Sequence, residues 1–297
     1  MRITELFERG EFVVTAEVGP PKGFNIDHLV EEANTYLKTR VHAVNVTDNQ
    51  SSVMRLGSLA TCKVLKDHGH NAIFQVTCRD RNRIALQSDI LSAALLGIDN
   101  LLLLTGDHTT LGDHPGAKPV FDLDSVSLAH AVKKMEEGSD IAGNAIDGEP
   151  PKFAKGAVVS PCSDSVDVQL AKMEQKVKAG VEYFQTQGVY EPEKFIKFME
   201  QAKQFGVPVQ LGIIIPKNVG MCRYMNANVA GVHVPDEMIE ELKADPEKTK
   251  AGITGVEIAA RLIRECKDYC QGVHIMALGW ENKVPDILDQ AGIPPIK

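Results

Sequence analysis

The chain lacks an excess of basic residues and has no long apolar run. Lysine and arginine number 32 against 40 aspartate and glutamate residues, which gives a formal net charge of −8. Because a nucleic-acid-binding protein takes much of its affinity from basic residues on phosphates, this balance argues against that class. The most hydrophobic region, residues 91–105, is interrupted by Gly97, Asp99 and Asn100 and falls short of the roughly 20 apolar residues that cross a bilayer. We therefore predict no membrane span and no nucleic-acid partner, and the lack of an apolar signal-peptide stretch at the N-terminus favours a cytoplasmic protein.

Several catalytic and metal-binding signatures are also absent. No G-x-G-x-x-G follows a predicted strand, and no G-x-S-x-G, H-E-x-x-H or Walker motif occurs. The six cysteines are mostly far apart in a chain large enough to fold without disulfides, so we expect reduced thiols. Cys266 and Cys270 are four residues apart on a predicted helix, yet no second cysteine or histidine pair follows at zinc-finger spacing. The sequence therefore predicts no resident metal and leaves the role of these two thiols open.

What the chain does have is a regular alternation of short apolar runs and segments with helical spacing. Runs that are apolar on both faces are typical of buried parallel strands. Eight such strands in 297 residues predict an α/β protein with one (β/α)8 (TIM) barrel, a single domain over residues 1–297. The predicted strands are 12–18, 43–47, 72–78, 100–106, 154–159, 183–189, 208–215 and 273–279. The predicted helices are 28–37, 58–66, 84–96, 125–136, 168–179, 193–205, 235–243 and 246–269, the last with a break near Gly252 or Gly255.

A barrel of this kind carries its chemistry at the C-terminal ends of its strands. Within residues 13–21 (Val-Val-Thr-Ala-Glu-Val-Gly-Pro-Pro), Glu17 stands late in an apolar strand that Gly-Pro-Pro then ends. A barrel mouth that excludes water strips hydration from an ionised carboxyl, which favours the protonated acid and suits a proton donor. Glu17 is therefore a candidate general acid. A structural carboxylate, hydrogen-bonded to a neighbouring strand or paired with a lysine, is an equal alternative.

Two further strand ends carry polar groups. The fourth run ends in Gly106 and Asp107, and a long connector over residues 107–122 follows. Gly106 would let a ligand approach the backbone, and Asp107 could accept hydrogen bonds from the amino or amide groups of a heterocycle, although capping a turn is the competing interpretation. Gln185 and Gln187 face the same way in the sixth run, which suits amide recognition of a flat polar ligand. A buried amide held only for packing is the alternative.

Histidines beside carboxylates allow a metal-dependent hydrolase as a minor alternative. His108 and His114 follow the fourth strand, each next to an aspartate, whereas His68 and His70 belong to an expected surface loop at the opposite end of the barrel. A catalytic metal draws its ligands from several strand ends, and no histidine ends the first, second, third, sixth or eighth run. The histidine pattern thus does not favour a metal site.

Three motifs together resemble the methylenetetrahydrofolate reductase family over nearly the whole chain. They are residues 16–21 around Glu17, residues 104–107 (Leu-Thr-Gly-Asp), and Thr186 with Gln187 ahead of residues 188–191 (Gly-Val-Tyr-Glu). Their spacing and strand order match those of the family. The resemblance implies a flavin-dependent (β/α)8 barrel that reduces 5,10-methylenetetrahydrofolate to 5-methyltetrahydrofolate, in one-carbon metabolism and methionine biosynthesis.

The same resemblance implies roles for individual residues. It makes Glu17 the acid that protonates a folate nitrogen as the imidazolidine ring opens, sets Asp107 between flavin and pterin, and gives Gln187 the family's folate-binding amide. The implied cofactor is FAD, with FMN as the alternative. The residues at positions of flavin contact are Thr47, Gln75, Leu104, Thr105, Gly106, Asp107 and Lys176.

Departures from the family pattern concern the cofactor and the electron donor. Thr105 stands where many relatives have arginine, Gln75 where they have histidine, and residues 278–280 (Leu-Gly-Trp) where they have an arginine that helps to hold folate. Asn226 occupies the place of an aromatic residue that stacks on the nicotinamide, unless Tyr224 substitutes for it. We therefore expect either NAD(P)H or a partner redox protein as electron donor. The alternative function is a flavin- or folate-binding barrel subunit of a larger redox complex, inactive with NAD(P)H alone, and a homo-oligomer is equally open.

Overall fold

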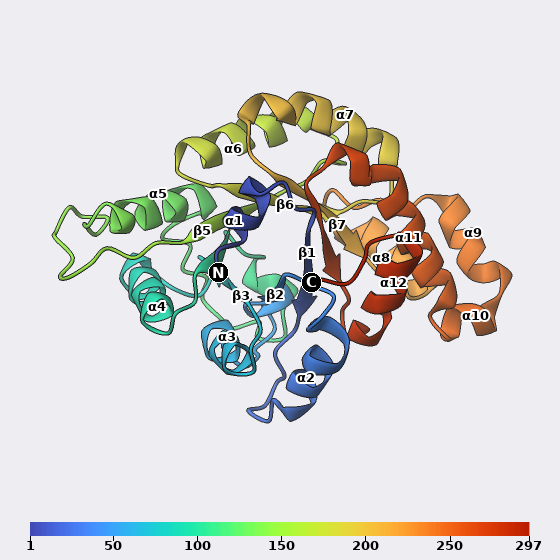
Figure 1. Ribbon diagram of the computed structural model, residues 1–297, viewed down its shortest axis with the longest axis horizontal. Coiled ribbons are helices and arrows are strands. Elements are labelled where there is room, and N and C mark those ends of the chain that lie inside the picture. The colour runs from blue at the N-terminus through green and yellow to red at the C-terminus, as the bar shows by residue number, and fades with distance from the viewer. Residues whose placement is uncertain (297) are drawn as a thin grey trace.

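Eight parallel strands pair in chain order, and β8 closes the barrel against β1 (Figure 1). The structure is a computed structural model that describes residues 1–296. The closed sheet confirms the predicted (β/α)8 barrel, because every strand lies within three residues of the apolar run that predicted it. The strands are β1 Val13–Val18, β2 Ala43–Val46, β3 Ala72–Thr77, β4 Asn100–Leu104, β5 Ala154–Val159, β6 Tyr183–Gly188, β7 Val209–Ile214 and β8 Gly272–Met276.

Apart from α1, the helices lie around the outside of the barrel (Figure 1). The long predicted helix before β8 breaks as expected at Gly252, whose φ of 80° is a left-handed conformation that glycine adopts without steric cost. The helix predicted over residues 28–37 continues beyond α2 as a π-helical turn at Ala33–Leu37. The helices are α1 Ile3–Glu8, α2 Asp27–Glu32, α3 Ser58–Asp67, α4 Arg83–Leu95, α5 Ser125–Glu136, α6 Val166–Lys178, α7 Pro192–Ala202, α8 Val219–Asn228, α9 Asp236–Ala244, α10 Pro246–Lys250, α11 Ile253–Cys266 and α12 Val284–Gln290.

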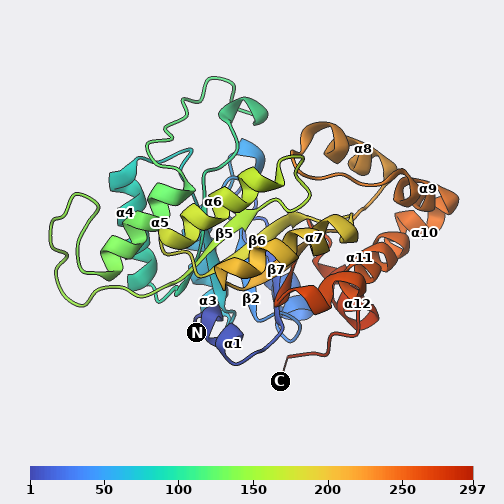
Figure 2. The ribbon, with the colours of Figure 1, turned by 90° about the horizontal axis from the view of Figure 1, so that it is seen from above.

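The two ends of the barrel differ. Both termini and α1 lie at one end, and the loop after β4 and α8 lie at the other (Figure 2). Ile3 is fully buried against an interior cluster that includes Ile73, Leu102 and Tyr183, and Phe7 packs on the same cluster. Because α1 precedes β1, it covers the end where the strands begin. The open end is therefore the one formed by the C-terminal ends of the strands.

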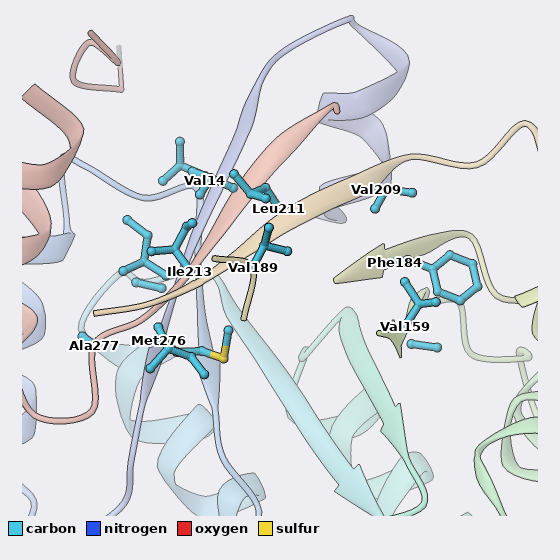
Figure 3. Packing of buried hydrophobic residues seen from close by; sticks show 14 of the residues in the cluster. Val14, Val159, Phe184, Val189, Val209, Leu211, Ile213, Met276 and Ala277 are labelled. Atoms are coloured by element: carbon cyan, nitrogen blue, oxygen red, sulfur yellow. The ribbon is translucent and has the colours of Figure 1, made fainter. Parts of the chain in front are cut away.

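Side chains alternate between two environments along each strand. Those that point outward, such as Val14, Phe184, Leu211 and Ile213, belong to the large apolar core between the strands and the helices (Figure 3). Those that point inward are apolar near the end covered by α1 and polar above it. The polar inward residues include Thr15, Asn45, Gln185, Gln210 and His274, each at most 4% exposed.

Within the described part of the chain, no helix combines the length and the apolar character needed to span a membrane.

Candidate functional site

The C-terminal ends of the strands surround a cavity of about 320 Å³, called the mouth cavity below. It is lined by most of the residues that the sequence singled out. These are Glu17, Gln75, Leu104, Thr105, Gly106, Asp107, Gln185, Thr186 and Gln187. The residues come from β1, β3, β4 and β6 or from the turns that follow them, so the topology brings together groups that are up to 170 positions apart in the sequence.

Glu17 lies in the wall between the mouth cavity and a neighbouring side cavity of about 430 Å³. Its side chain is almost wholly buried at 9% exposure. One carboxylate oxygen lies 3.7 Å from Nε2 of His274, and the other lies 3.5 Å from Nε2 of Gln50. Within residues 1–296 no lysine pairs with it, which removes one form of the structural alternative. Thr47 lines the side cavity rather than the mouth cavity, and its hydroxyl is buried without a hydrogen-bond partner.

A hydrogen-bonded layer of amides lies inside the barrel below Glu17. Gln210 donates through Nε2 to the backbone carbonyl of Val13 at 2.9 Å, which fixes the orientation of its amide because a carbonyl only accepts. Gln210 Oε1 then accepts from Nε2 of Gln185 at 3.0 Å, and Gln185 Oε1 accepts from Nδ2 of Asn45 at 2.7 Å. Gln185 is thus held by the barrel interior, in agreement with the packing alternative for this residue.

The same layer determines the tautomer of His274. Both glutamine amide nitrogens point at Thr15 Oγ1 at 3.3 Å, and Nδ1 of His274 lies 3.0 Å from the same oxygen. Amide N–H groups cannot accept, so among the partners of the Thr15 hydroxyl only Nδ1 can take its proton. Neutral His274 therefore carries its hydrogen on Nε2, which faces Glu17. The imidazole is an oriented donor to the carboxylate.

Asp107 follows β4 at a turn that needs glycine. Gly106 has a φ of 92°, and a Cβ there would lie 3.2 Å from the Cβ atoms of Thr77 and Arg79. The Asp107 carbonyl accepts from Nη1 of Arg79 at 3.4 Å, while its side chain is exposed and lines the mouth cavity. The turn therefore presents the Asp107 carboxylate to the cavity, while Arg79 bonds to the backbone of the same residue.

Gln187 stands at an irregularity between β6 and β7. The strand register shifts between Gln185 and Gly188, which is the local signature of a bulge. Thr186 Oγ1 accepts from the backbone N–H of Gly212 at 2.8 Å, and Gln187 Oε1 accepts from that of Gly188 at 3.1 Å. Bulges at barrel rims redirect side chains, and here the NH2 group of Gln187 is left to face the mouth cavity.

Lys176 lies in a third cavity of about 350 Å³, which shares Leu104 and Thr105 with the mouth cavity. Its ammonium group donates to the Val158 carbonyl at 2.6 Å. Burial lowers the pKa of Lys176 to about 8, and the charge of Lys172 adds to this effect. The same cavity is lined by Lys172 and by Asp124, whose carboxylate caps the N-terminus of α5. The two lysines together exceed the charge of this one carboxylate, so the cavity suits an anion.

The sequence analysis missed several polar residues of the mouth cavity, among them Asp48, Arg79 and His274. Asp48 Oδ2 accepts from the backbone N–H and the hydroxyl of Thr77, both at 2.9 Å, and from Arg81. A usable signal existed for His274, since it interrupts an apolar strand at an inward position. For Asp48 and Arg79 the signal is absent, because both follow the strands in turns whose course the sequence pattern does not specify.

The residues expected near the nicotinamide do not line the mouth cavity within the described chain. Asn226 in α8 is bonded twice to the Val234 backbone, at 2.9 and 2.7 Å. Tyr224 is 64% exposed. The Trp280 ring lies under the ammonium group of Lys217, 4.9 Å from the ring centroid. The same ring packs beside Gly252, where the Cβ of a larger residue would lie 3.2 Å from it.

Among residues 1–296, no group of three histidine, cysteine, aspartate or glutamate side chains is arranged to hold a metal. The expectation that His70 belongs to a surface loop is wrong. His70 is only 7% exposed, and its Nε2 lies 3.0 Å from Asn34 Oδ1. Cys266 and Cys270 are also buried, and burial raises the pKa of both thiols, that of Cys270 to about 11. Cys270 Sγ donates to the Gly272 carbonyl at 3.3 Å, so this thiol packs near the start of β8.

Comparison with known proteins gives a consistent result. A family model described as methylenetetrahydrofolate reductase matches residues 2–292. "Methylenetetrahydrofolate reductase 2" of Schizosaccharomyces pombe is 26% identical over 255 residues, which cover 80% of this chain and 38% of that protein. "5,10-methylenetetrahydrofolate reductase" of Pectobacterium carotovorum subsp. carotovorum is 24% identical over 263 residues, which cover 86% of this chain and 82% of that protein. The chain thus spans well under half of the yeast relative and most of the bacterial one.

A solved structure shares the fold. It is an uncharacterized protein from Clostridium thermocellum that binds two copies of 5-methyl-5,6,7,8-tetrahydrofolic acid. Its TM-score is 0.66 at 13% identity, with 98% of each chain covered. Because the family model matches nearly the whole sequence, the chain belongs to the methylenetetrahydrofolate reductase family.

Proposed function

We propose that the protein catalyses the flavin-dependent reduction of 5,10-methylenetetrahydrofolate to 5-methyltetrahydrofolate, in one-carbon metabolism and methionine biosynthesis. The observation that carries this proposal is the arrangement of Glu17, Asp107 and Gln187 around one cavity, with His274 oriented behind Glu17. Opening the imidazolidine ring requires a proton on a folate nitrogen, and an almost buried carboxyl group beside the substrate is suited to supply it.

In this mechanism Glu17 holds the proton until the ring nitrogen takes it. The Nε2–H group of His274 then faces the carboxylate that remains, and its hydrogen bond stabilises the negative charge. The distance of 3.7 Å is long for a hydrogen bond, and such contacts shorten when substrate fills a site. His274 is therefore a positioning residue, because it acts on the substrate through Glu17.

Recognition of the pterin falls to Asp107 and Gln187. A pterin presents amino and ring N–H donors along one edge and carbonyl or ring nitrogen acceptors along another. The Asp107 carboxylate accepts only, and the NH2 group of Gln187 donates, so the pair can distinguish the two edges. Their positions on β4 and β6 would hold the ring across the mouth of the barrel.

The residues present fit a flavin. The Thr47 hydroxyl, buried without a partner, lines the side cavity and can hydrogen-bond to a polar group of the cofactor there. The cavity of Lys176 adjoins the mouth cavity and offers positive charge to a phosphate. Gln75, Leu104, Thr105, Gly106 and Asp107 line the mouth cavity and would contact the ring system. A bound flavin would supply the hydride. We propose FAD as the cofactor, with FMN as the alternative.

For the electron donor we propose a partner redox protein, with NADH or NADPH as the alternative. Asn226 is bonded to the Val234 backbone and offers no aromatic face for stacking. Large apolar side chains are also exposed on segments that follow strand ends, at Phe24, Met54, Leu111 and Leu278. The same exposed apolar side chains would serve as the partner contact in the second candidate function, a flavin- or folate-binding subunit of a redox complex.

The test is oxidation of 5-methyltetrahydrofolate with an artificial electron acceptor by purified protein that carries its flavin. We expect turnover together with a flavin absorbance band. Folate binding without turnover would favour the subunit function. A colourless protein that binds neither added flavin nor folate would refute both. Mass spectrometry of the released cofactor distinguishes FAD from FMN.

A further inference from the structure

Three loops meet beside the mouth cavity, and Arg79 lies between them. These loops follow β2, β3 and β4, and the Arg79 side chain is only 2% exposed. The guanidinium donates to the Asn49 carbonyl at 3.1 Å and to the Asp107 carbonyl at 3.4 Å. It also pairs with both carboxylate oxygens of Asp80, at 2.8 and 2.7 Å. The Arg79 side chain thus joins the Asn49 peptide, in the loop after β2, to the Asp107 peptide, in the loop after β4.

The backbone of Arg79 adds a further link. Its carbonyl accepts from the N–H of Val120 at 2.8 Å, and Val120 belongs to the far end of the loop after β4. The same loop is therefore tied to Arg79 at two points, through the Asp107 carbonyl and the Val120 amide. The backbone makes the Val120 contact whatever the side chain, whereas the Asp107 contact needs the guanidinium group.

The loop after β2 is held in an unfavourable conformation at the contact. Asn49, Ser51 and Ser52 have φ values of 46°, 55° and 59°, which residues other than glycine adopt rarely and only where surrounding contacts impose them. The Ser52 carbonyl packs directly on the loop after β4, since a Cβ on Gly112 would lie 1.9 Å from it. The two loops are thus in backbone contact at Gly112 and joined by Arg79 at their bases.

Burial of this charge needs a reason, because an arginine removed from water is costly unless its N–H groups are all engaged. The planar fork of the guanidinium reaches one carboxylate and two carbonyls on different loops at once. A lysine has a single ammonium group and cannot make this set of contacts. The contact pattern, rather than the charge alone, accounts for arginine at this position.

We propose that Arg79 is a positioning residue for Asp107: by bonding the Asp107 peptide and the Asn49 peptide together, it aims the Asp107 carboxylate at the amino and amide groups of a bound pterin. The effect on substrate rests on the proposed function, whereas the joining of the loops does not.

The primary variant is Arg79→Lys, which keeps the charge and loses the fork. Its matched control is Arg83→Lys, because Arg83 pairs with Asp122 at the other end of the same loop and is half exposed. Hydrogen exchange measured by mass spectrometry should speed up at least about tenfold over residues 107–120 in Arg79→Lys and stay unchanged in Arg83→Lys. Thermal unfolding of each variant checks that the barrel is intact.

The second measurement is a double-mutant cycle on the affinity for 5-methyltetrahydrofolate, read by calorimetry. We expect Arg79→Lys to weaken binding about 10- to 100-fold, as small misplacements of contact groups do. In an Asp107→Asn background the same change should weaken binding less than about twofold, because the group that Arg79 aims has gone. Arg83→Lys should leave the affinity unchanged in both backgrounds.

A third variant, Gly112→Ala, separates the loops without touching Arg79 and guards against an Arg79→Lys protein that fails to fold. It should reproduce both the faster hydrogen exchange over residues 107–120 and the weaker binding of 5-methyltetrahydrofolate. Unchanged exchange in Arg79→Lys overturns the joining of the loops, whatever the protein does with folate. Faster exchange with additive affinity losses overturns the positioning of Asp107. A wild-type protein that binds no folate refutes the proposed function and, with it, the role of Asp107, while the exchange data still decide whether Arg79 joins the loops.

Discussion

The proposed reaction depends most on one carboxyl group. Glu17→Gln keeps the shape of the side chain and removes the transferable proton. We expect the variant to retain flavin and to be reduced by dithionite like the wild type, while folate turnover falls about 10²- to 10⁴-fold, as is usual when a general acid is lost. Oxidation of 5-methyltetrahydrofolate with an artificial acceptor measures the change. An unaltered folate rate would remove Glu17 from the mechanism.

A variant of His274 provides a second test of the role assigned to Glu17. His274→Phe removes the Nε2–H donor that faces Glu17, so turnover should fall by less than in Glu17→Gln. The double variant should be no slower than Glu17→Gln alone, because the histidine acts only through the carboxylate. An independent further loss in the double variant would assign His274 a role of its own.

Lys176 predicts a pH dependence of flavin affinity. The protonated ammonium is the form that attracts a phosphate, and burial lowers the pKa of Lys176 to about 8. Raising the pH from 7 to 9 therefore removes the positive charge of Lys176, so the affinity for FAD or FMN should fall over this interval. Fluorescence titration of the apoprotein measures it. Riboflavin is the control because it has no phosphate, and an equal fall for riboflavin would contradict the assignment.

The residue scale also shows where sequence reasoning works and where it stops. Glu17 could be found because a carboxylate in an apolar strand is anomalous in any register. His274 contacts Thr15 across 259 positions, and this contact exists only because β8 closes the barrel on β1. The sequence alone could not tell which of Gln185 and Gln187 is free to bind a ligand, since both lie on the inward face. The structure decides this, because the amide layer engages the side chain of Gln185 in hydrogen bonds to Gln210 and Asn45.

At the scale of elements, α5 offers a defined test of stability. Its N-cap Asp124 accepts from the backbone N–H of Ser127, and Ser127 Oγ accepts from the backbone N–H of Asp124, both at 2.8 Å. Asp124→Ala removes one half of this reciprocal cap and should lower the free energy of unfolding by about 1 kcal/mol. Urea denaturation of the apoprotein measures the change. Asp124→Asn retains an acceptor oxygen, so a similar loss in that variant would mean that the charge, not the cap, is responsible.

The elements themselves were predictable to different degrees. The strands follow from the sequence because each is buried on both faces and therefore reads as an apolar run. Helices such as α5 follow because one apolar face packs on the barrel. The pattern gave no sign of α1, α8 or α12. α1 is six residues long with charges interleaved, and α8 has only Cys222 and Met225 buried, so neither displays a helical apolar stripe.

At the scale of the whole molecule, the rim of the barrel has two distinct sectors. The sector formed by the loops after β2, β3 and β4 is tied together by Arg79 and presents Asp107. The sector formed by α8 and the loop after β8 presents exposed Tyr224 and Leu278 but no aromatic ring toward the mouth cavity within the described chain. The sector that presents Asp107, the proposed pterin-binding residue, is thus held by side-chain hydrogen bonds, whereas the other sector offers no stacking surface for a nicotinamide ring.

This asymmetry leads to the prediction about the electron donor. Aromatic stacking contributes about 0.5–1.5 kcal/mol beyond area burial, so its absence weakens nicotinamide binding without forbidding it. We expect the isolated protein to be reduced slowly by both NADH and NADPH when mixed anaerobically in a stopped-flow instrument, and rapidly and completely by dithionite. The dithionite reaction shows that the flavin is intact and accessible. Bleaching of the oxidised flavin by either nucleotide at a rate that supports turnover would rule out the need for a partner and identify the protein as a nicotinamide-dependent reductase.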